Sequence, residues 1–262
     1  MRTVLGVIAA ALLALALLPF FGSGYEVSFT TQVFMWIALA ASWNLISGFT
    51  GYVSFGHVAF FGVGAYTGAL LITKAGWHWL PAGVAGCGPA MLLALIIGYP
   101  CLRLKGPYFA IAMLGLNEVV RALVSYFEGF TGGGNGISLP PIGSIVPVYY
   151  AMGVVALCVP LLTWWIIRSK FGLRLLSIRE DETAAEAMGI NTARLKLYAF
   201  LLSAAFPGIV GGFYASYASH IEPLSVFPLL TTITMIIMCL LGGPGTVLGP
   251  VIGAVLLSVF QE

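Results

Sequence analysis

Apolar residues fill most of this 262-residue chain in long runs, and short polar segments separate the runs. A helix needs about 20 apolar residues to cross the hydrocarbon core of a bilayer. Nine runs approach that length, so the pattern predicts an all-α, polytopic transmembrane helical bundle of about nine spans. The expected spans are Val4–Phe21, Val33–Ile46, Tyr52–Ile72, Ala82–Leu102, Tyr108–Phe127, Val148–Ile167, Leu197–Tyr217, Leu224–Leu241 and Val247–Phe260.

Two of these runs allow a second interpretation. The first, Val4–Phe21, follows Met1-Arg2 as a signal peptide would. It is longer than the roughly 7 to 15 apolar residues of a signal-peptide core, and no A-x-A site closes it, so a retained span is favoured. The third, Tyr52–Ile72, is interrupted by several glycines and could break into half-helices.

Composition narrows the class of protein further. Hydrophobic residues make up 60% of the chain and charged residues 8%, against about 25% charged in ordinary soluble domains. The whole chain, residues 1–262, is therefore expected to form a single transmembrane domain. The same hydrophobicity excludes disorder. A net charge of +2, scattered along the chain, excludes nucleic acid as a partner, because nucleic acid requires a clustered basic face.

The basic residues give an orientation. If the N-terminus is cytoplasmic and the spans alternate, nine of the eleven basic residues lie on the cytoplasmic side. Lys74 falls outside and Arg121 lies within a span, and the opposite orientation reverses this bias. Since Lys and Arg accumulate in cytoplasmic loops, a multi-pass protein with a cytoplasmic N-terminus is expected.

Metal and enzyme chemistry are not indicated. The four cysteines lie inside apolar runs without C-x-x-C spacing, and the three histidines have no zinc-binding spacing. Ser54, His57, Asn117 and Glu118 are the polar residues that an intramembrane enzyme would have to use, and they are scattered over two spans. We therefore predict no metal site, no catalytic residue and no enzyme activity for this chain.

Glu118 and Arg121 are two charges within one expected span. Their spacing of three places them on one helical face. Charges inside a membrane are costly and often mark a pathway, although a mutual ion pair near the span's outer end explains them equally well. Under the functional interpretation, Asn117, Glu118 and Arg121 face the bundle interior, where they hydrate a translocation path or brace a moving helix. Ser54 and His57 are the other candidates for this path. For His57, a hydrogen-bonded packing role is the alternative.

Glycines recur at intervals of four within several spans. Such spacing puts small residues on one helical face, where backbones approach closely, so helix packing is the first interpretation. Flexible or broken helices around a transport path are the second. The residues concerned are Gly64, Gly68, Gly208, Gly212, Gly245, Gly249 and Gly253, with Pro207 as a candidate bend.

The longest polar segment, residues 168–196, carries ten of the twenty charged residues. Ser177-Ile-Arg-Glu180 has the spacing of a capping box, which predicts a helix that begins there and stops at Gly189. Asn191 can cap the span that follows. Ala184, Ala185 and Met188 form a small apolar face, which is too small for membrane binding but suits docking into a groove on another protein.

Five stretches together resemble a known family. Glu182–Asn191 (ETAAEAMGIN) resembles the EAA loop of bacterial ABC importer permeases, whose coupling helix docks into a cytoplasmic ATPase subunit. Four others are similar to the branched-chain amino acid permeases of the LivM type, and the second and third of these favour that type over the LivH type. They are GYVSFGHVAFFGVGAY at Gly51–Tyr66, LRLKGPYFAI at Leu102–Ile111, TGGGNG at Thr131–Gly136 and LGGPGTVLGP at Leu241–Pro250.

The resemblance implies a bacterial inner-membrane importer subunit that works by alternating access. Its partners would be a related LivH-type permease, two cytoplasmic ATPases that use ATP and Mg, and a periplasmic solute-binding protein, with no cofactor on this chain. The chain has no Walker motif, in agreement with that division of labour. The implied ATPase-coupling residues are Glu180, Glu182, Ala184, Ala185, Met188 and Gly189.

Two further points follow from the resemblance. Members of the family have about ten spans and continue past the equivalent of Phe260 with another span and a basic tail, whereas this sequence ends at Glu262. Branched-chain amino acids are the expected substrates, with related small polar solutes as alternatives. An ATP-independent channel or secondary transporter is the competing function, and it gives no reason for the Glu182–Asn191 loop.

Overall fold

The computed structural model describes residues 14–104 and 106–262 and is built mainly from helices. Within these residues, six helical stretches are long and apolar enough to cross a membrane. They are α2 (Gly24–Thr50), α4 with α5 (Trp79–Ala85 and Cys87–Cys101), α6 (Pro107–Tyr126), α8 (Val146–Ile167), α11 (Thr192–Ala218) and α12 with α13 (Pro223–Val226 and Leu229–Gly242). The prediction of an all-α, polytopic membrane fold is confirmed.

The predicted count of nine spans is not confirmed. Two further apolar helices, α3 (His57–Thr73) and α14 (Gly249–Phe260), are shorter than the six long stretches. At 1.5 Å per residue, the twelve residues of α14 extend over about 18 Å, well short of a hydrocarbon core about 30 Å thick. Residues 4–13 of the expected span Val4–Phe21 lie outside the described residues. The remaining residues of this span, 14–21, are helical.

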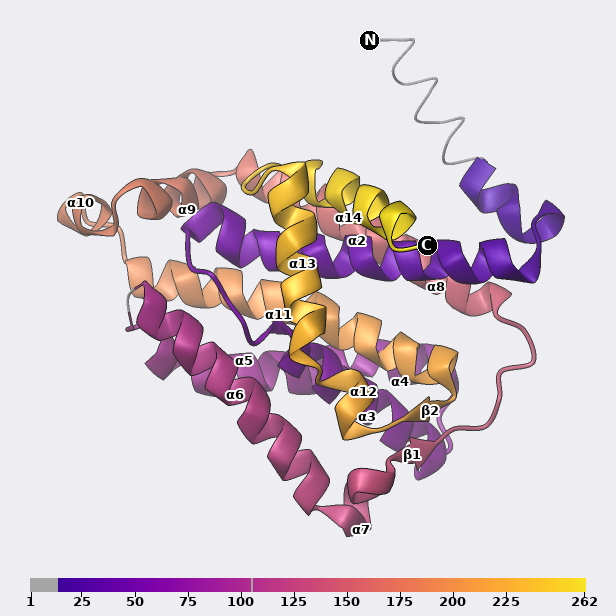
Figure 1. The fold of residues 1–262 in the computed structure, drawn as a ribbon. Coiled ribbons are helices and arrows are strands. Elements are labelled where there is room, and N and C mark those ends of the chain that lie inside the picture. Colours follow the sequence, from indigo (N-terminus) through magenta and orange to yellow (C-terminus); the bar gives the residue numbers. More distant parts are fainter. Residues whose placement is uncertain (1–13, 105) are drawn as a thin grey trace.

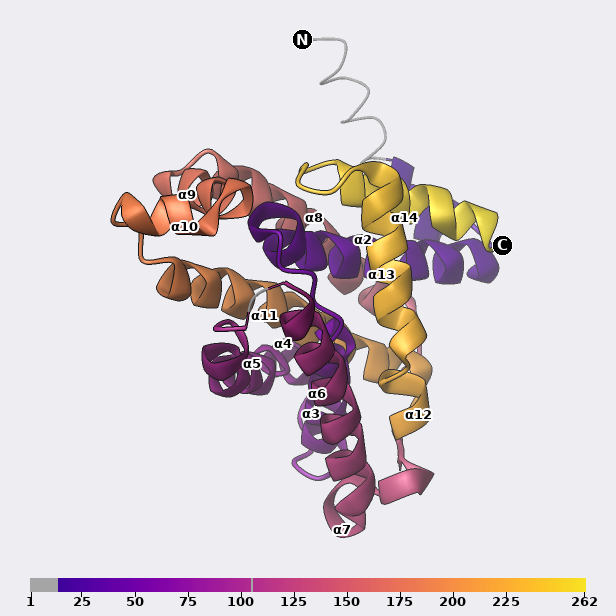
Figure 2. The same ribbon diagram turned by 60° about the vertical axis from the view of Figure 1, so that its left-hand side comes forward.

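Short elements gather at two opposite ends of the molecule (Figures 1 and 2). At one end lie α9 (Lys170–Glu180) and α10 (Glu182–Ala187). At the other lie α7 (Glu128–Thr131), the 3₁₀ helix η1 (Gly133–Asn135) and the antiparallel strands β1 (Ile137–Ser138) and β2 (His220–Ile221). The segments that join successive helices therefore alternate between the two ends, as a chain that crosses a bilayer repeatedly requires.

The core forms around α11 and the second half of α2. Phe200 of α11 contacts Phe60 of α3 and Phe109 of α6 edge-to-face, with ring centroids 5.4 and 6.2 Å apart. Such aromatic contacts add to the stabilisation from apolar burial. The outward faces of α5, α6 and α8 expose large apolar side chains such as Ile96, Ile111 and Leu161. These exposed faces are suited to contact with membrane lipid.

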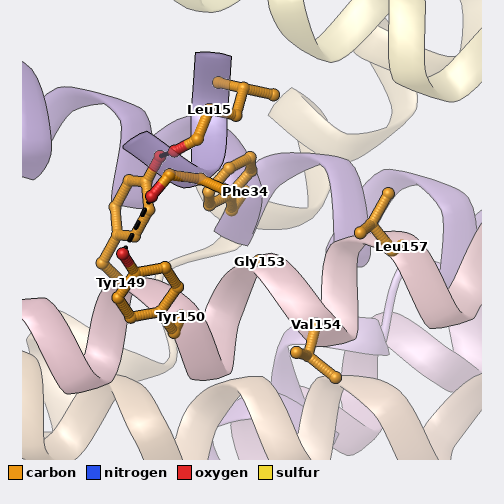
Figure 3. Close-up of a pocket in the computed structure, with 8 residues that line it drawn as sticks. Leu15, Phe34, Tyr149, Tyr150, Gly153, Val154 and Leu157 are labelled. Carbon is orange, nitrogen blue, oxygen red and sulfur yellow. Dashed lines mark hydrogen bonds between the residues drawn. The ribbon is translucent and has the colours of Figure 1, made fainter. Parts of the chain in front are cut away.

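The helical residues 14–21 dock onto α8 through two tyrosines (Figure 3). Tyr149 donates a hydrogen bond of 2.5 Å to the carbonyl of Leu15, and Tyr150 donates one of 2.9 Å to that of Ala16. The regular helical donor for the Leu15 carbonyl would be the N–H of residue 19, which is proline and has none. The Tyr149 hydroxyl therefore replaces a hydrogen bond that the sequence removes from this helix.

Candidate functional site

The charged segment 168–196 forms two helices, not the single helix that the sequence predicted. Ser169 caps α9, and Asp181 caps α10 by accepting hydrogen bonds from the N–H groups of Thr183 (2.8 Å) and Ala184 (3.0 Å). Ser177 lies within α9 and donates to the carbonyl of Arg174. The predicted capping box at Ser177–Glu180 is therefore wrong, because Asp181 is an equally good N-cap four residues later.

The ends of this segment agree with the sequence. α10 ends at Ala187, and Gly189 follows with φ of +81°, the left-handed conformation that terminates a helix. Asn191 caps α11, as predicted, by accepting a hydrogen bond of 3.1 Å from the N–H of Arg194. The polar segment is thus fixed at both ends by local hydrogen bonds.

The predicted apolar face of α10 is divided between two directions. Ala184 and Met188 are exposed, and 81% of the Met188 surface is accessible. Ala185 is 2% accessible and faces the bundle, so its assignment to the exposed face is wrong. Consecutive helical residues point about 100° apart, so Ala185 can face the bundle while Ala184 faces outward. Glu180, at the end of α9, is exposed.

Glu182 also turns toward the bundle, where it meets Lys196 of α11. The Lys196 ammonium lies 2.6 Å from a Glu182 carboxylate oxygen, with 3% and 15% of the two side chains accessible. It also donates to the Tyr52 hydroxyl at 2.8 Å and to the Leu102 carbonyl at 3.0 Å. A buried charge must be paired and hydrogen-bonded to be tolerated, and here all three ammonium protons have an acceptor.

Tyr52 and Thr192 complete this polar cluster. Tyr52 donates to the second carboxylate oxygen of Glu182, and its ring lies against the ammonium, 4.3 Å from ring centroid to nitrogen. Burial, followed by the hydrogen bond to Glu182, raises the pKa of the Tyr52 hydroxyl above its ordinary value. Thr192 donates to Glu186 at 2.6 Å. Tyr52 therefore stays protonated and available as a donor.

The helix α9 is tied to the bundle at a separate place. Arg179 donates a hydrogen bond of 2.8 Å to the carbonyl of Gly48 near the end of α2. Asn44, one turn earlier, accepts from the Gly245 N–H and donates to the Thr246 carbonyl, each at 2.8 Å. The loop between α13 and α14 is thereby held against the C-terminal end of α2, beside α9.

Sequence reasoning did not identify Lys196 and Tyr52. Lys196 was counted only as a basic residue of the loop, although it lies five positions into α11. The available signal was a lysine at the start of an apolar span, fourteen residues after a glutamate at the start of a short helix. This signal does not predict the ion pair, because nothing in the sequence indicates that those two helices are neighbours.

Asn117, Glu118 and Arg121 of α6 do not all face the interior of this chain. Asn117 is buried and donates to the Phe227 carbonyl at 3.1 Å. Glu118 and Arg121 form an ion pair at 2.5 Å, with 47% and 39% of their side chains accessible. They line an open groove of about 500 Å³ with Pro223 and Leu224. The expectation that this pair faces the bundle interior is wrong for the single chain.

Ser54 and His57 are fully buried where α3 begins. The Ser54 hydroxyl and His57 Nδ1 lie 2.9 Å apart, and the imidazole contacts the rings of Phe60 and Phe200 edge-to-face. Among the described residues, no hydrogen bond joins this pair to Asn117, Glu118 or Arg121. The polar residues proposed for a path thus lie in separate groups.

The glycines of α3 and α11 face each other directly. A Cβ on Gly64 would collide with the Gly208 carbonyl, and one on Gly68 would lie 2.9 Å from the Gly212 carbonyl oxygen. Small residues on both helices let these backbones approach closely. α11 is continuous through Pro207, which is buried.

Gly249 and Gly253 of α14 lie against α13 in the same way, close to the carbonyls of Gly242 and Met238. Gly245 differs from the prediction, because it lies in the loop before α14 with φ of +76° and is not part of a helical ladder. Its lack of a side chain makes room for Arg179, which a Cβ at this position would strike.

Comparison with known proteins decides the family. The family model for the branched-chain amino acid transport system permease component matches residues 25–262. The chain belongs to this family. It is 32% identical to the high-affinity branched-chain amino acid transport system permease protein LivM of Salmonella typhimurium, over 96% of this chain and 67% of that protein.

Other relatives agree with this membership. The chain is 24% identical to LivH of Escherichia coli K12, over 89% of this chain and 85% of LivH. It is 28% identical to a putative glucose ABC transporter permease protein of Haloferax volcanii, over 70% of this chain and 60% of that protein. No solved structure matches. The chain is a LivM-type, multi-pass membrane permease subunit of an ABC importer, as the motifs predicted.

Proposed function

We propose that this chain moves branched-chain amino acids, or related small polar solutes, into the cytoplasm by alternating access. It lies in the bacterial inner membrane with a cytoplasmic N-terminus, as one transmembrane domain with residues 168–196 as its coupling segment. The related permease would be of the LivH type, because the chain resembles both LivM and LivH. Two ATPases that use ATP and Mg, and a periplasmic solute-binding protein, complete the importer.

One observation carries the coupling role. The charge-rich helices α9 and α10 project at one end of the molecule (Figure 2), present Ala184 and Met188 outward, and are bonded to the membrane helices by Arg179 and Lys196. A helix with a small exposed apolar face and firm attachment behind it suits docking into a groove on a partner. An ATP-independent channel has no use for such an arrangement.

Co-purification tests this proposal. The chain is expressed together with a LivH-type permease and the ATPase subunits of the same importer, and it is captured by a tag on its own end. ATPase subunits are expected in the captured complex. Gly189→Arg adds a bulky charge to a left-handed turn beside Met188 and should release the ATPases and stop uptake. Normal ATPase association and uptake in this variant would show that α10 is not the docking helix.

The substrate is tested separately. Leucine, isoleucine and valine are the expected ligands, and relatives named for other substrates, such as glucose, make a direct measurement necessary. Titration of the neighbouring solute-binding protein with these amino acids, and with glucose as the comparison, identifies the class. Tight binding of glucose and none of leucine would contradict the proposed substrate.

A further inference from the structure

The Lys196 ammonium joins four parts of the chain at one point. Its acceptors are Glu182 of α10, the Leu102 carbonyl just after α5, and the Tyr52 hydroxyl in the segment between α2 and α3, while Lys196 itself belongs to α11. We call the cluster of Lys196, Glu182, Tyr52 and the Leu102 carbonyl the Lys196 latch. Thr192 of α11 also donates to Glu186 of α10, at 2.6 Å.

The latch resists being opened. Burial strengthens each of these bonds, because little water competes for the ammonium and the carboxylate. Moving α10 away from α11 would leave the buried Lys196 ammonium without its carboxylate, which costs much more than separating two exposed charges. A force on α10 therefore moves the inner ends of α5 and α11 and the α2–α3 segment with it.

The two faces of α10 point in different directions. Ala184 and Met188 are exposed and available to a partner, whereas Glu182 and Ala185 face the bundle. A glutamate at this position of the EAA-like segment is thus directed into its own chain and not toward the exposed docking face. Glu182 is bound on one carboxylate oxygen by Tyr52 of the α2–α3 segment and on the other by Lys196 of α11.

We propose that Lys196, Glu182 and Tyr52 are positioning residues that transmit movement of α10 to the membrane helices, so that ATP hydrolysis in the partner subunits drives transport. The inference rests on the proposed function and adds to it the groups that carry the force. The alternative is that the ion pair only stabilises the fold. The two ideas differ in what happens when both charges are removed together.

The experiment compares variants of the assembled importer, reconstituted into vesicles with its binding protein. Lys196→Met and Glu182→Gln each leave one buried charge unpaired and can lower the amount of folded protein. The paired variant Lys196→Met with Glu182→Gln removes both charges, and such neutral replacements are often as stable as the ion pair. Lys196→Arg keeps the charge and its donors. Arg194→Met is the matched control, because Arg194 is exposed and only two residues away.

Three quantities are measured: the amount of complex with bound ATPases, the ATP hydrolysed, and the amino acid taken up per ATP. The paired neutral variant is expected to assemble and to hydrolyse ATP, with uptake per ATP reduced at least about fivefold. Lys196→Arg should retain most of the uptake per ATP, and Arg194→Met all of it. A role in stability alone cannot produce this pattern, because uptake per ATP is independent of protein amount.

Two results would overturn the inference and are distinct from failure of the proposed function. If the paired neutral variant takes up substrate with normal yield per ATP, the latch transmits nothing. The same conclusion follows if Lys196→Arg is as defective as Lys196→Met while both assemble normally. By contrast, absence of ATPase subunits from the unmodified complex would contradict the proposed function, and the transmission role with it.

Discussion

Arg179 of α9 donates a hydrogen bond of 2.8 Å to the main-chain carbonyl of Gly48, in the last turn of α2. That carbonyl is among those at a helix end without a partner inside the helix, and the guanidinium supplies one. The same side chain lies beside Gly245, where a Cβ would strike it. Arg179 thus holds α9, the end of α2 and the α13–α14 loop together.

Replacing this arginine should loosen all three elements. Arg179→Met is expected to lower the free energy of unfolding by about 1 to 2 kcal/mol, because a charge-assisted hydrogen bond is lost. Arg174→Met, on the exposed surface of the same helix, is the control and should be nearly neutral. Denaturant unfolding in detergent micelles measures both. Equal stability of the two variants would show that the bond to Gly48 contributes nothing.

The glycine contact between α3 and α11 gives a second prediction. Gly64→Ala should destabilise the bundle by about 1 to 3 kcal/mol, because the new methyl group meets the Gly208 carbonyl and the helices must separate. Gly115→Ala, in α6 with open space around it, should instead be neutral or stabilising, because alanine favours helix. Thermal unfolding of the purified chain distinguishes them; a Gly64→Ala protein as stable as Gly115→Ala would contradict the close contact.

The start of α10 gives a third prediction. Asp181→Ala removes the side chain that caps α10 and should destabilise this helix by about 0.5 to 2 kcal/mol. Ser177→Ala should change little, because Ser177 lies within α9. Amide hydrogen exchange at Thr183 and Ala184 reports the difference, with faster exchange expected in Asp181→Ala alone. Asp181→Asn should preserve protection, since asparagine caps equally well.

A fourth prediction concerns the ion pair on α6. Arg121→Leu leaves the Glu118 carboxylate without its partner at the groove shared with Pro223 and Leu224. If the groove belongs to the translocation path, uptake is lost while the amount of protein in the membrane is unchanged, and Arg121→Lys restores part of it. Uptake assays with quantified membrane fractions decide this. Normal uptake by Arg121→Leu would indicate that Glu118 and Arg121 only neutralise each other's charge.

Local signals in the sequence were sufficient for some features of the site. The family was predicted from five motifs and is confirmed. Asn191 caps α11 as its position before an apolar run indicated, because a cap depends only on neighbouring residues. The Ser177 prediction was wrong because Ser177 and Asp181 are both acceptable caps, so the local sequence does not choose between them.

The residue pattern along the chain established that this is a polytopic helical membrane protein with its charge concentrated at residues 168–196, because hydropathy and charge are properties of each segment alone. It also showed which faces of α3 and α11 carry small residues. The packing of the helices in three dimensions was needed to show that these faces meet, that Glu118 and Arg121 lie at an open groove, and that Glu182 pairs with Lys196. Some of these relationships join residues that are distant in the sequence, and others concern how exposed a side chain is. Both kinds depend on which helices become neighbours.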